Sequence, residues 1–80
     1  MSQNFDVELD CKGMSCPMPI LKTKKFVDGM EVGQVVKMTA TDPGSVPDVQ
    51  AWTKKTGHEL MGHDEQDGVY TFYIKKTERA

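Results

Sequence analysis

The chain has 80 residues, so against the usual domain size of roughly 100–200 residues it forms one domain at most. It carries 10 Lys and Arg against 12 Asp and Glu, a formal net charge of -2, so direct nucleic-acid binding, which needs a basic excess, is not expected. With 38% hydrophobic residues we expect one small core over residues 1–80, ordered from about 5 to 76, and chemistry near the surface rather than in a deep cavity.

The first half of the chain predicts a strand, a helix and a second strand. Residues 5–11 alternate apolar and acidic side chains, a period of two that indicates a half-buried strand. A helix is expected over about residues 16–28, because Pro17 suits a first helical position and Gly29 suits a helix end. Residues 34–41 then predict a strand.

The second half predicts a helix followed by two strands. Ser45 is expected to be the N-cap of the helix, and Gly57 is expected to end it. Residues 58–65 give a weaker strand signal, Asp67-Gly68 is typical of a hairpin turn, and residues 69–75 alternate as a strand does.

The element order β-α-β-α-β-β predicts an α/β fold. The last two strands form an antiparallel hairpin, while strands joined through helices pair in a parallel or mixed arrangement. Two helices cover only one face of such a sheet. We therefore expect a two-layer α/β sandwich, with a four-stranded mixed sheet covered on one face by two helices.

Neither a signal peptide nor a membrane span is expected. The first residues lack the positive and apolar regions of a signal peptide, and no apolar run approaches roughly 20 residues. Two cysteines are too few for a disulfide-stapled secreted scaffold. The sequence thus favours a cytoplasmic protein, not bound to a membrane, whose thiols stay reduced.

The segment from Gly13 to Pro19 holds the candidate reactive group. With Cys16 as helix N-cap, its sulfur would lie at the positive end of the helix dipole, which lowers a thiol pKa from about 8.5. Pro17 and Pro19 lack N–H donors, so the Met18 N–H is the expected partner of the sulfur. The prolines also stiffen the turn.

An unpaired, activated thiolate suits covalent carriage of sulfur. The chain has no C-x-x-C pair for dithiol chemistry. A zinc site of Cys11, Cys16, His58 and His63 is disfavoured, because the two histidines, five residues apart on one strand, are expected to face opposite sides. We expect no metal and no resident cofactor.

The pattern Leu9-Asp10-x-x-Gly13-x-x-Cys16-Pro17-x-Pro19, followed by Lys22 and Lys25, resembles the signature of the TusA/SirA sulfur-carrier family. The segments Thr41–Ser45 and Thr56–His58 resemble the second-helix region of that family, so the resemblance spans Leu9 to Lys76. It implies a fold similar to the C-terminal domain of initiation factor three.

The resemblance also implies a sulfurtransferase in which Cys16 carries a transient persulfide. The donor would be a cysteine desulfurase or a rhodanese-like protein, and the acceptor another sulfur-relay protein. The relay would feed tRNA thiolation, cofactor sulfuration or dissimilatory sulfur metabolism. We expect the carrier to be a monomer.

Other residues are assigned to the same region as expectations. Cys11 follows the inward parity of its strand and is expected in the core, with a role as a secondary thiol left open. An alternative function is a non-catalytic regulatory or interaction module that uses the Cys-Pro-Met-Pro turn as a docking surface. The supporting turn residues are Asp10, Gly13, Pro17, Met18 and Pro19, and the partner-binding candidates are Lys12, Lys22 and Lys25.

Overall fold

The computed structural model describes residues 5–15 and 17–77. The elements follow the predicted order β-α-β-α-β-β. They are β1 (Val7–Cys11), α1 (Met18–Asp28), β2 (Val35–Ala40), α2 (Ser45–Thr56), β3 (Glu59–Gln66) and β4 (Val69–Lys75).

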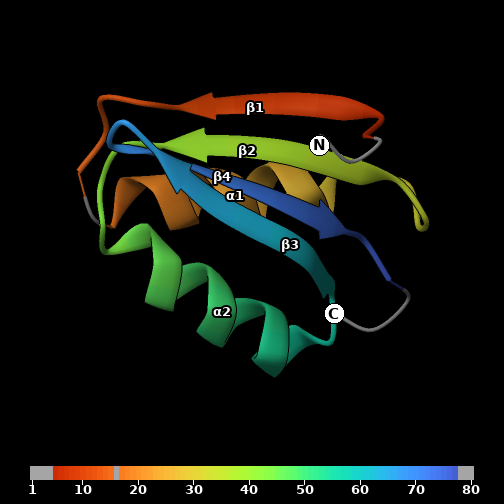
Figure 1. Ribbon diagram of the computed structural model, residues 1–80. Helices are drawn as coiled ribbons and strands as arrows, with labels where there is room; N and C mark the ends of the chain where they lie inside the picture. Colours follow the sequence, from red (N-terminus) through yellow and green to blue (C-terminus); the bar gives the residue numbers. More distant parts are fainter. Residues whose placement is uncertain (1–4, 16, 78–80) are drawn as a thin grey trace.

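The four strands form one mixed sheet in the order β1-β2-β4-β3. β1 pairs with β2 in parallel, and β4 pairs antiparallel with both β2 and β3. Both helices lie on one face of this sheet, as predicted, and the other face is open (Figure 1). Because Cys11 pairs with Ala40, the carboxyl ends of β1 and β2 reach the same edge of the sheet, and the segments that follow them emerge side by side.

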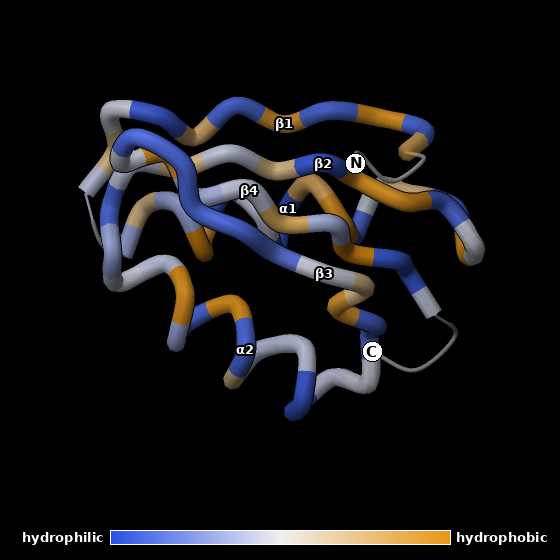
Figure 2. Tube along the Cα trace, in the orientation of Figure 1, coloured by the Kyte–Doolittle hydropathy of each residue, from blue (hydrophilic) through white to orange (hydrophobic). Residues whose placement is uncertain are grey.

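The core lies between the sheet and the helices. In β1, Leu9 and Cys11 are buried while Glu8 and Asp10 are exposed, an alternation that is visible along the trace in Figure 2. Across the sheet, inward side chains that are fully buried include Val36, Met38, Ala40, Phe72 and Ile74. The helices complete the core with Ile20, Val27, Val49 and Trp52. The period-two prediction is thus confirmed for Val7–Cys11, whereas Phe5 lies before the strand and is 41% exposed.

The start of α2 differs from the prediction. Gly44 is the N-cap, and Ser45 is the first residue of the helix. No described side chain forms a capping hydrogen bond at this end of α2. The Ser45 hydroxyl is buried and has no hydrogen-bond partner among the described residues. The Asp42 carboxylate accepts the Gly44 N–H at 3.3 Å, so the preceding turn is held by Asp42.

The β3–β4 hairpin has the turn that Asp67-Gly68 predicts. Both residues have positive φ, 55° and 81°, as a type I′ turn requires. In β3, however, the register shifts between Leu60 and Gly62, and this irregularity changes the parity of the strand.

The shift in β3 corrects the expectation that the two histidines face opposite sides. His58 packs on Trp52 of α2, with ring centroids 5.4 Å apart, and His63 stacks on Phe72 at 6.0 Å. His63 also contacts Gln50 of α2, with a nitrogen-to-nitrogen distance of 3.4 Å. Both histidines therefore lie on the helix side of the sheet.

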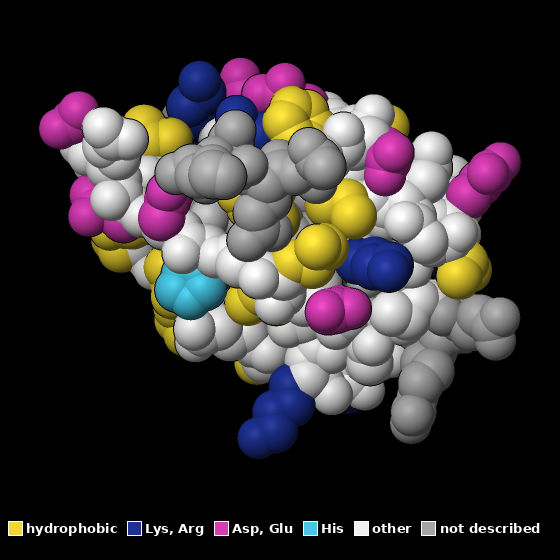
Figure 3. All heavy atoms as spheres, turned by 45° about the vertical axis from the view of Figure 1, so that its right-hand side comes forward, with side chains coloured by type: hydrophobic (Ala, Val, Ile, Leu, Met, Phe, Trp, Pro, Cys, Tyr) yellow, Lys and Arg dark blue, Asp and Glu magenta, His cyan; other side chains and the backbone are white. Residues whose placement is uncertain are grey.

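The surface mixes charge and apolar side chains. On the face drawn in Figure 3, acidic and basic side chains alternate with scattered hydrophobic ones. Large hydrophobic side chains that are exposed include Phe5, Met18, Leu21, Val32 and Met61. In the described part of the chain, no helix combines the length and the apolar character needed to cross a bilayer.

Candidate functional site

The turn between β1 and α1, residues 12–15, leads directly to Cys16. Cys16 itself lies outside the described residues, and the residues on either side of it define the site. In Figure 1 this turn lies at the same end of the molecule as the β2–α2 connection and the β3–β4 hairpin.

Asp10 holds the base of the turn. Its carboxylate oxygen Oδ1 accepts the Lys12 N–H at 2.9 Å and lies 3.5 Å from the Thr39 hydroxyl of the neighbouring strand β2. Its main-chain oxygen accepts a hydrogen bond from the Lys22 ammonium of α1 at 3.3 Å. Asp10 thus connects the turn to β2 and to α1.

Thr41 holds the next residue of the turn and was not singled out by sequence reasoning. The Gly13 N–H donates to the Thr41 hydroxyl at 2.9 Å, and Gly13 has a φ of 83°. Thr41 follows the last residue of β2. It lies near Gly13 because β1 and β2 pair in parallel, which brings the ends of both strands to one edge of the sheet. That pairing was left open between parallel and mixed at the level of sequence.

The start of α1 corrects two predictions. The helix begins at Met18, so Pro17 occupies the N-cap position and Pro19 the second helical position. Cys16 therefore precedes the N-cap instead of occupying it. The Met18 N–H donates to the Ser15 carbonyl at 2.9 Å, so it is not the free donor that was expected to face the sulfur.

Cys11 is a core thiol, as its parity in β1 predicts. Its side chain is fully buried, and its Sγ lies 3.9 Å from the Pro19 carbonyl oxygen. Burial raises the pKa of the Cys11 thiol, although a hydrogen bond with Thr23 and the charge of Lys22 oppose this effect. Cys11 is therefore a protonated packing group near neutral pH.

A groove between the two helices opens beside Pro17. It has a volume of about 340 Å³ and is lined by Pro17, Ile20, Lys24, Asp48, Ala51, Trp52 and Lys55. Of the lysines predicted to bind partners, Lys12 lies in the turn, Lys22 lies in α1 with its ammonium on the Asp10 carbonyl, and Lys25 lies in the last turn of α1. Lys24 and Lys55 are the lysines that line the groove.

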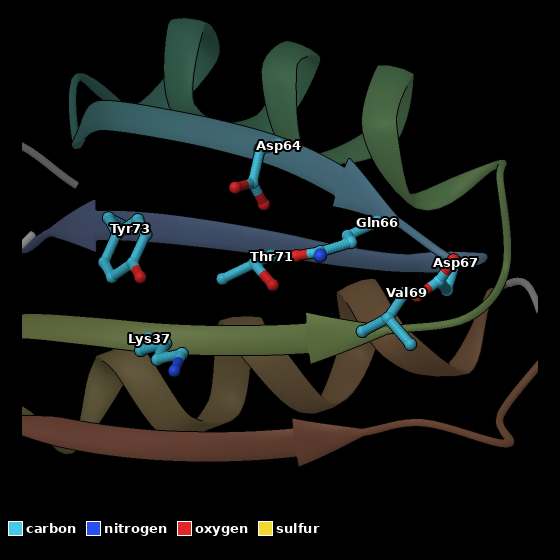
Figure 4. Close-up of a pocket in the computed structure, with 7 residues that line it drawn as sticks. All are labelled: Lys37, Asp64, Gln66, Asp67, Val69, Thr71 and Tyr73. Atoms are coloured by element: carbon cyan, nitrogen blue, oxygen red, sulfur yellow. The ribbon is translucent and has the colours of Figure 1, made fainter. Parts of the chain in front are cut away.

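A second hollow, of about 420 Å³, lies on the open face of the sheet. Figure 4 shows its side chains in front of the strands, with both helices behind them. Lys37 comes from β2, Thr71 and Tyr73 from β4, and Asp64 from β3. This hollow is separated from the helix groove by the thickness of the sheet.

The described residues contain no cluster of side chains that could bind a metal ion. Within residues 5–15 and 17–77, no three His, Cys, Asp or Glu side chains are arranged to hold a metal ion. Cys11 contacts Pro19, whereas the His58 ring accepts the Thr77 N–H at 3.2 Å. These residues thus belong to separate parts of the core.

Comparisons with known proteins agree with this architecture. The sequence model of the family described as Sulfurtransferase TusA matches residues 7–76. The chain is 51% identical over 74 residues to the sulfur carrier protein TusA of Allochromatium vinosum, covering 92% of this chain and 97% of that protein. It is 44% identical over 80 residues to a putative sulfur carrier protein of Halobacterium salinarum, covering 96% of this chain and 99% of that protein.

A solved structure gives the same fold. The crystal structure of a SirA-like protein from Desulfitobacterium hafniense superimposes with a TM-score of 0.77 at 27% identity, covering 91% of this chain and all of that one. The fold and the extent of the sequence matches lead to one conclusion. The chain belongs to the TusA family of sulfurtransferases, whose relatives are sulfur carrier proteins.

Proposed function

We propose that this protein carries sulfur as a persulfide on Cys16. The observation that supports the proposal is the arrangement of the backbone on either side of Cys16. A turn bonded to Asp10 and Thr41 precedes it, and the N-terminus of an 11-residue helix follows it. The positive end of that helix favours a thiolate over a thiol.

The transfer is a thiol–persulfide exchange. The Cys16 thiolate attacks the terminal sulfur of a persulfide on the donor, a new S–S bond forms, and the donor's S–S bond breaks to release its cysteine thiolate. The reverse roles apply at the acceptor, whose thiolate attacks the sulfur held on Cys16. Each step exchanges one S–S bond for another, so no oxidant or reductant is consumed.

The turn residues have supporting roles in this proposal. Pro17 and Pro19 restrict the backbone around the start of α1, and Pro19 is buried while Met18 is 52% exposed beside it. Gly13 supplies the left-handed backbone that the turn requires. Together they would present the sulfur to a partner at little entropic cost.

The donor would be a cysteine desulfurase or a rhodanese-like protein, and the acceptor a second relay protein that serves tRNA thiolation, cofactor sulfuration or dissimilatory sulfur metabolism. Partner contacts would involve Lys12, Lys22 and Lys25, whose charges steer acidic surfaces toward the turn. We infer that the chain works as one monomeric domain in the cytoplasm, where thiols are kept reduced.

The proposal is tested by sulfur loading. The protein is incubated with a cysteine desulfurase and cysteine, and its intact mass is measured with and without a thiol reductant. We expect a gain of one sulfur atom that the reductant removes, that persists in Cys11→Ser and that is absent in Cys16→Ser. Loading of Cys16→Ser would contradict the assignment.

The alternative is a docking module that carries no sulfur. The groove beside Pro17 is the observation in its favour, since the apolar side chains of Trp52 and Ile20 are among the residues that line it. If neither a desulfurase nor a rhodanese-like donor loads the wild-type protein, the docking module replaces the carrier.

A further inference from the structure

We propose that Thr41 is a positioning residue for sulfur transfer, because its hydroxyl fixes the orientation of the turn that presents Cys16. This inference rests on the proposed function above and adds to it a residue from the segment that follows β2. Thr41 lies 28 residues from Gly13 in sequence and is joined to it by a 2.9 Å hydrogen bond.

Three consecutive N–H groups of the turn are bonded, but to different parts of the molecule. The Lys12 N–H is accepted by Asp10 at 2.9 Å, and the Met14 N–H by the Cys11 carbonyl at 3.3 Å. Asp10 and Cys11 belong to β1, so these two bonds would be kept if the turn moved as a continuation of its own strand. The Gly13 bond is different, since it joins the turn directly to the residue after β2, whereas Asp10 reaches β2 only through the 3.5 Å contact of its carboxylate with the Thr39 hydroxyl.

Among the described residues, no side-chain packing at Gly13 adds to the hydrogen bond that holds this residue near β2. A Cβ built at this glycine would meet no atom within 4 Å, so no other described residue packs against Gly13 on the side where a side chain would lie. Gly13 also has a φ of 83°, a region in which glycine moves readily. The Thr41 hydroxyl therefore restrains Gly13 relative to the end of β2, while the next residue, Met14, packs against the hydrophobic core.

Because Thr41 lies at the surface, its effect on the rate of sulfur transfer can be measured apart from its effect on folding stability. Thr41 and Gly13 are both exposed, so removal of the hydroxyl opens no cavity in the core. A sulfur that attacks an S–S bond must approach close to its axis, and a displacement of about 1 Å in such geometry can slow a reaction up to 100-fold. Thr41 is thus expected to affect the rate of transfer more than the folding equilibrium.

The experiment compares Thr41→Val, which removes the acceptor with little change in shape, with Thr41→Ser, which keeps it. Thr56→Val is the matched control. The Thr56 hydroxyl also accepts an N–H, that of His58 at 3.4 Å, and it donates to the Trp52 carbonyl at 2.8 Å, at the far end of α2. Sulfur uptake from a cysteine desulfurase is measured as kcat and KM, together with urea unfolding.

We expect Thr41→Val to lower kcat about 3- to 10-fold, as loss of one such hydrogen bond suggests, with KM within about twofold. Thr41→Ser should restore kcat, and Thr56→Val should lose stability without losing kcat. An unchanged kcat in Thr41→Val, no rescue by Thr41→Ser, or an equal fall in Thr56→Val would each overturn the role of Thr41. Thr41→Ala provides a second variant and should match Thr41→Val.

Failure of the proposed function gives a different result. If Cys16→Ser takes up sulfur as the wild type does, the carrier cysteine is wrong and Thr41 has no transfer to position. If Cys16→Ser is inactive and Thr41→Val is fully active, the carrier stands and the positioning role fails.

Discussion

The Cys11 thiol lies 3.9 Å from the carbonyl oxygen of Pro19, where the end of β1 passes beneath the first turn of α1. The Thr23 hydroxyl donates to the same oxygen at 2.7 Å. Pro19 has no N–H, but its carbonyl oxygen accepts from the Cys11 thiol of β1 and from the Thr23 hydroxyl in the next turn of α1. The first turn of α1 is thereby in contact with the end of β1, the strand that precedes it.

The two cysteines should differ in reactivity. Cys11 is fully buried and its pKa is raised by burial, so at neutral pH it should react with iodoacetamide only when the structure opens. Cys16 should alkylate at least about 10-fold faster, as measured by peptide mass spectrometry over a time course. Cys11→Ser identifies the Cys16 signal, and equal rates for the two thiols in the wild type would refute the difference.

Phe72 should be among the most costly core positions. Its side chain is fully buried in β4, at the centre of the sheet, so Phe72→Ala should lower the free energy of unfolding by about 3–5 kcal/mol. Leu21→Ala is the control, because Leu21 is 48% exposed and its loss should change stability by about 0.5 kcal/mol or less. Urea unfolding followed by Trp52 fluorescence measures both, and similar values would contradict the assigned core.

His58 should make stability depend on pH. Burial lowers the pKa of His58, Lys76 lowers it further and Asp28 opposes them, while the ring nitrogen Nδ1 accepts the Thr77 N–H at 3.2 Å. Because the folded pKa lies below the unfolded value of about 6.5, this stability is present above pH 6.5 and is lost as the pH falls toward the folded pKa.

The measurement for His58 is the free energy of unfolding between pH 7.5 and 5. His58→Asn removes the titrating group and should flatten the slope over this range, whereas His63→Asn should leave the His58 contribution in place. A slope that survives in His58→Asn would assign the effect to other groups.

The glycines after the two helices should respond in opposite directions. Gly57 ends α2 with a φ of 89°, so Gly57→Ala should destabilise the protein by about 1–2 kcal/mol. Gly29 ends α1 with a φ of -89°, and its added Cβ would meet only the Phe26 oxygen at 3.6 Å. Gly29→Ala should therefore stabilise the protein by about 0.4–1 kcal/mol, and the two melting temperatures would show it.

Much of the fold could be predicted because its signals are local. The alternation of Leu9 and Cys11 with acidic residues, and the Asp67-Gly68 turn, each depend on neighbouring residues alone. The irregularity between Leu60 and Gly62 has no such signal, and it moved His63 to the side of the sheet on which His58 lies. The prediction of Ser45 as the cap of α2 was wrong, because the chain already turns at Gly44, whose N–H is bonded to the Asp42 carboxylate.

The candidate site was predicted in its sequence but only partly in its geometry. The motif around Cys16 marks the turn, and Asp10 acts within that turn because it lies two residues before Lys12. Thr41 could not be found in this way, since its contact with Gly13 depends on how β1 and β2 pair. Lys24 and Lys55 likewise line one groove because two helices lie side by side.

The parallel pairing of β1 with β2 has a consequence for the order of folding. A hairpin such as β3–β4 closes a short loop, whereas β1 and β2 must enclose all of α1 before Val7 can reach Val36. The hydrogen bond from Gly13 to Thr41 forms only after that closure. A nascent or partly unfolded chain would therefore display its cysteine motif without the hydrogen bond that joins Gly13 to Thr41.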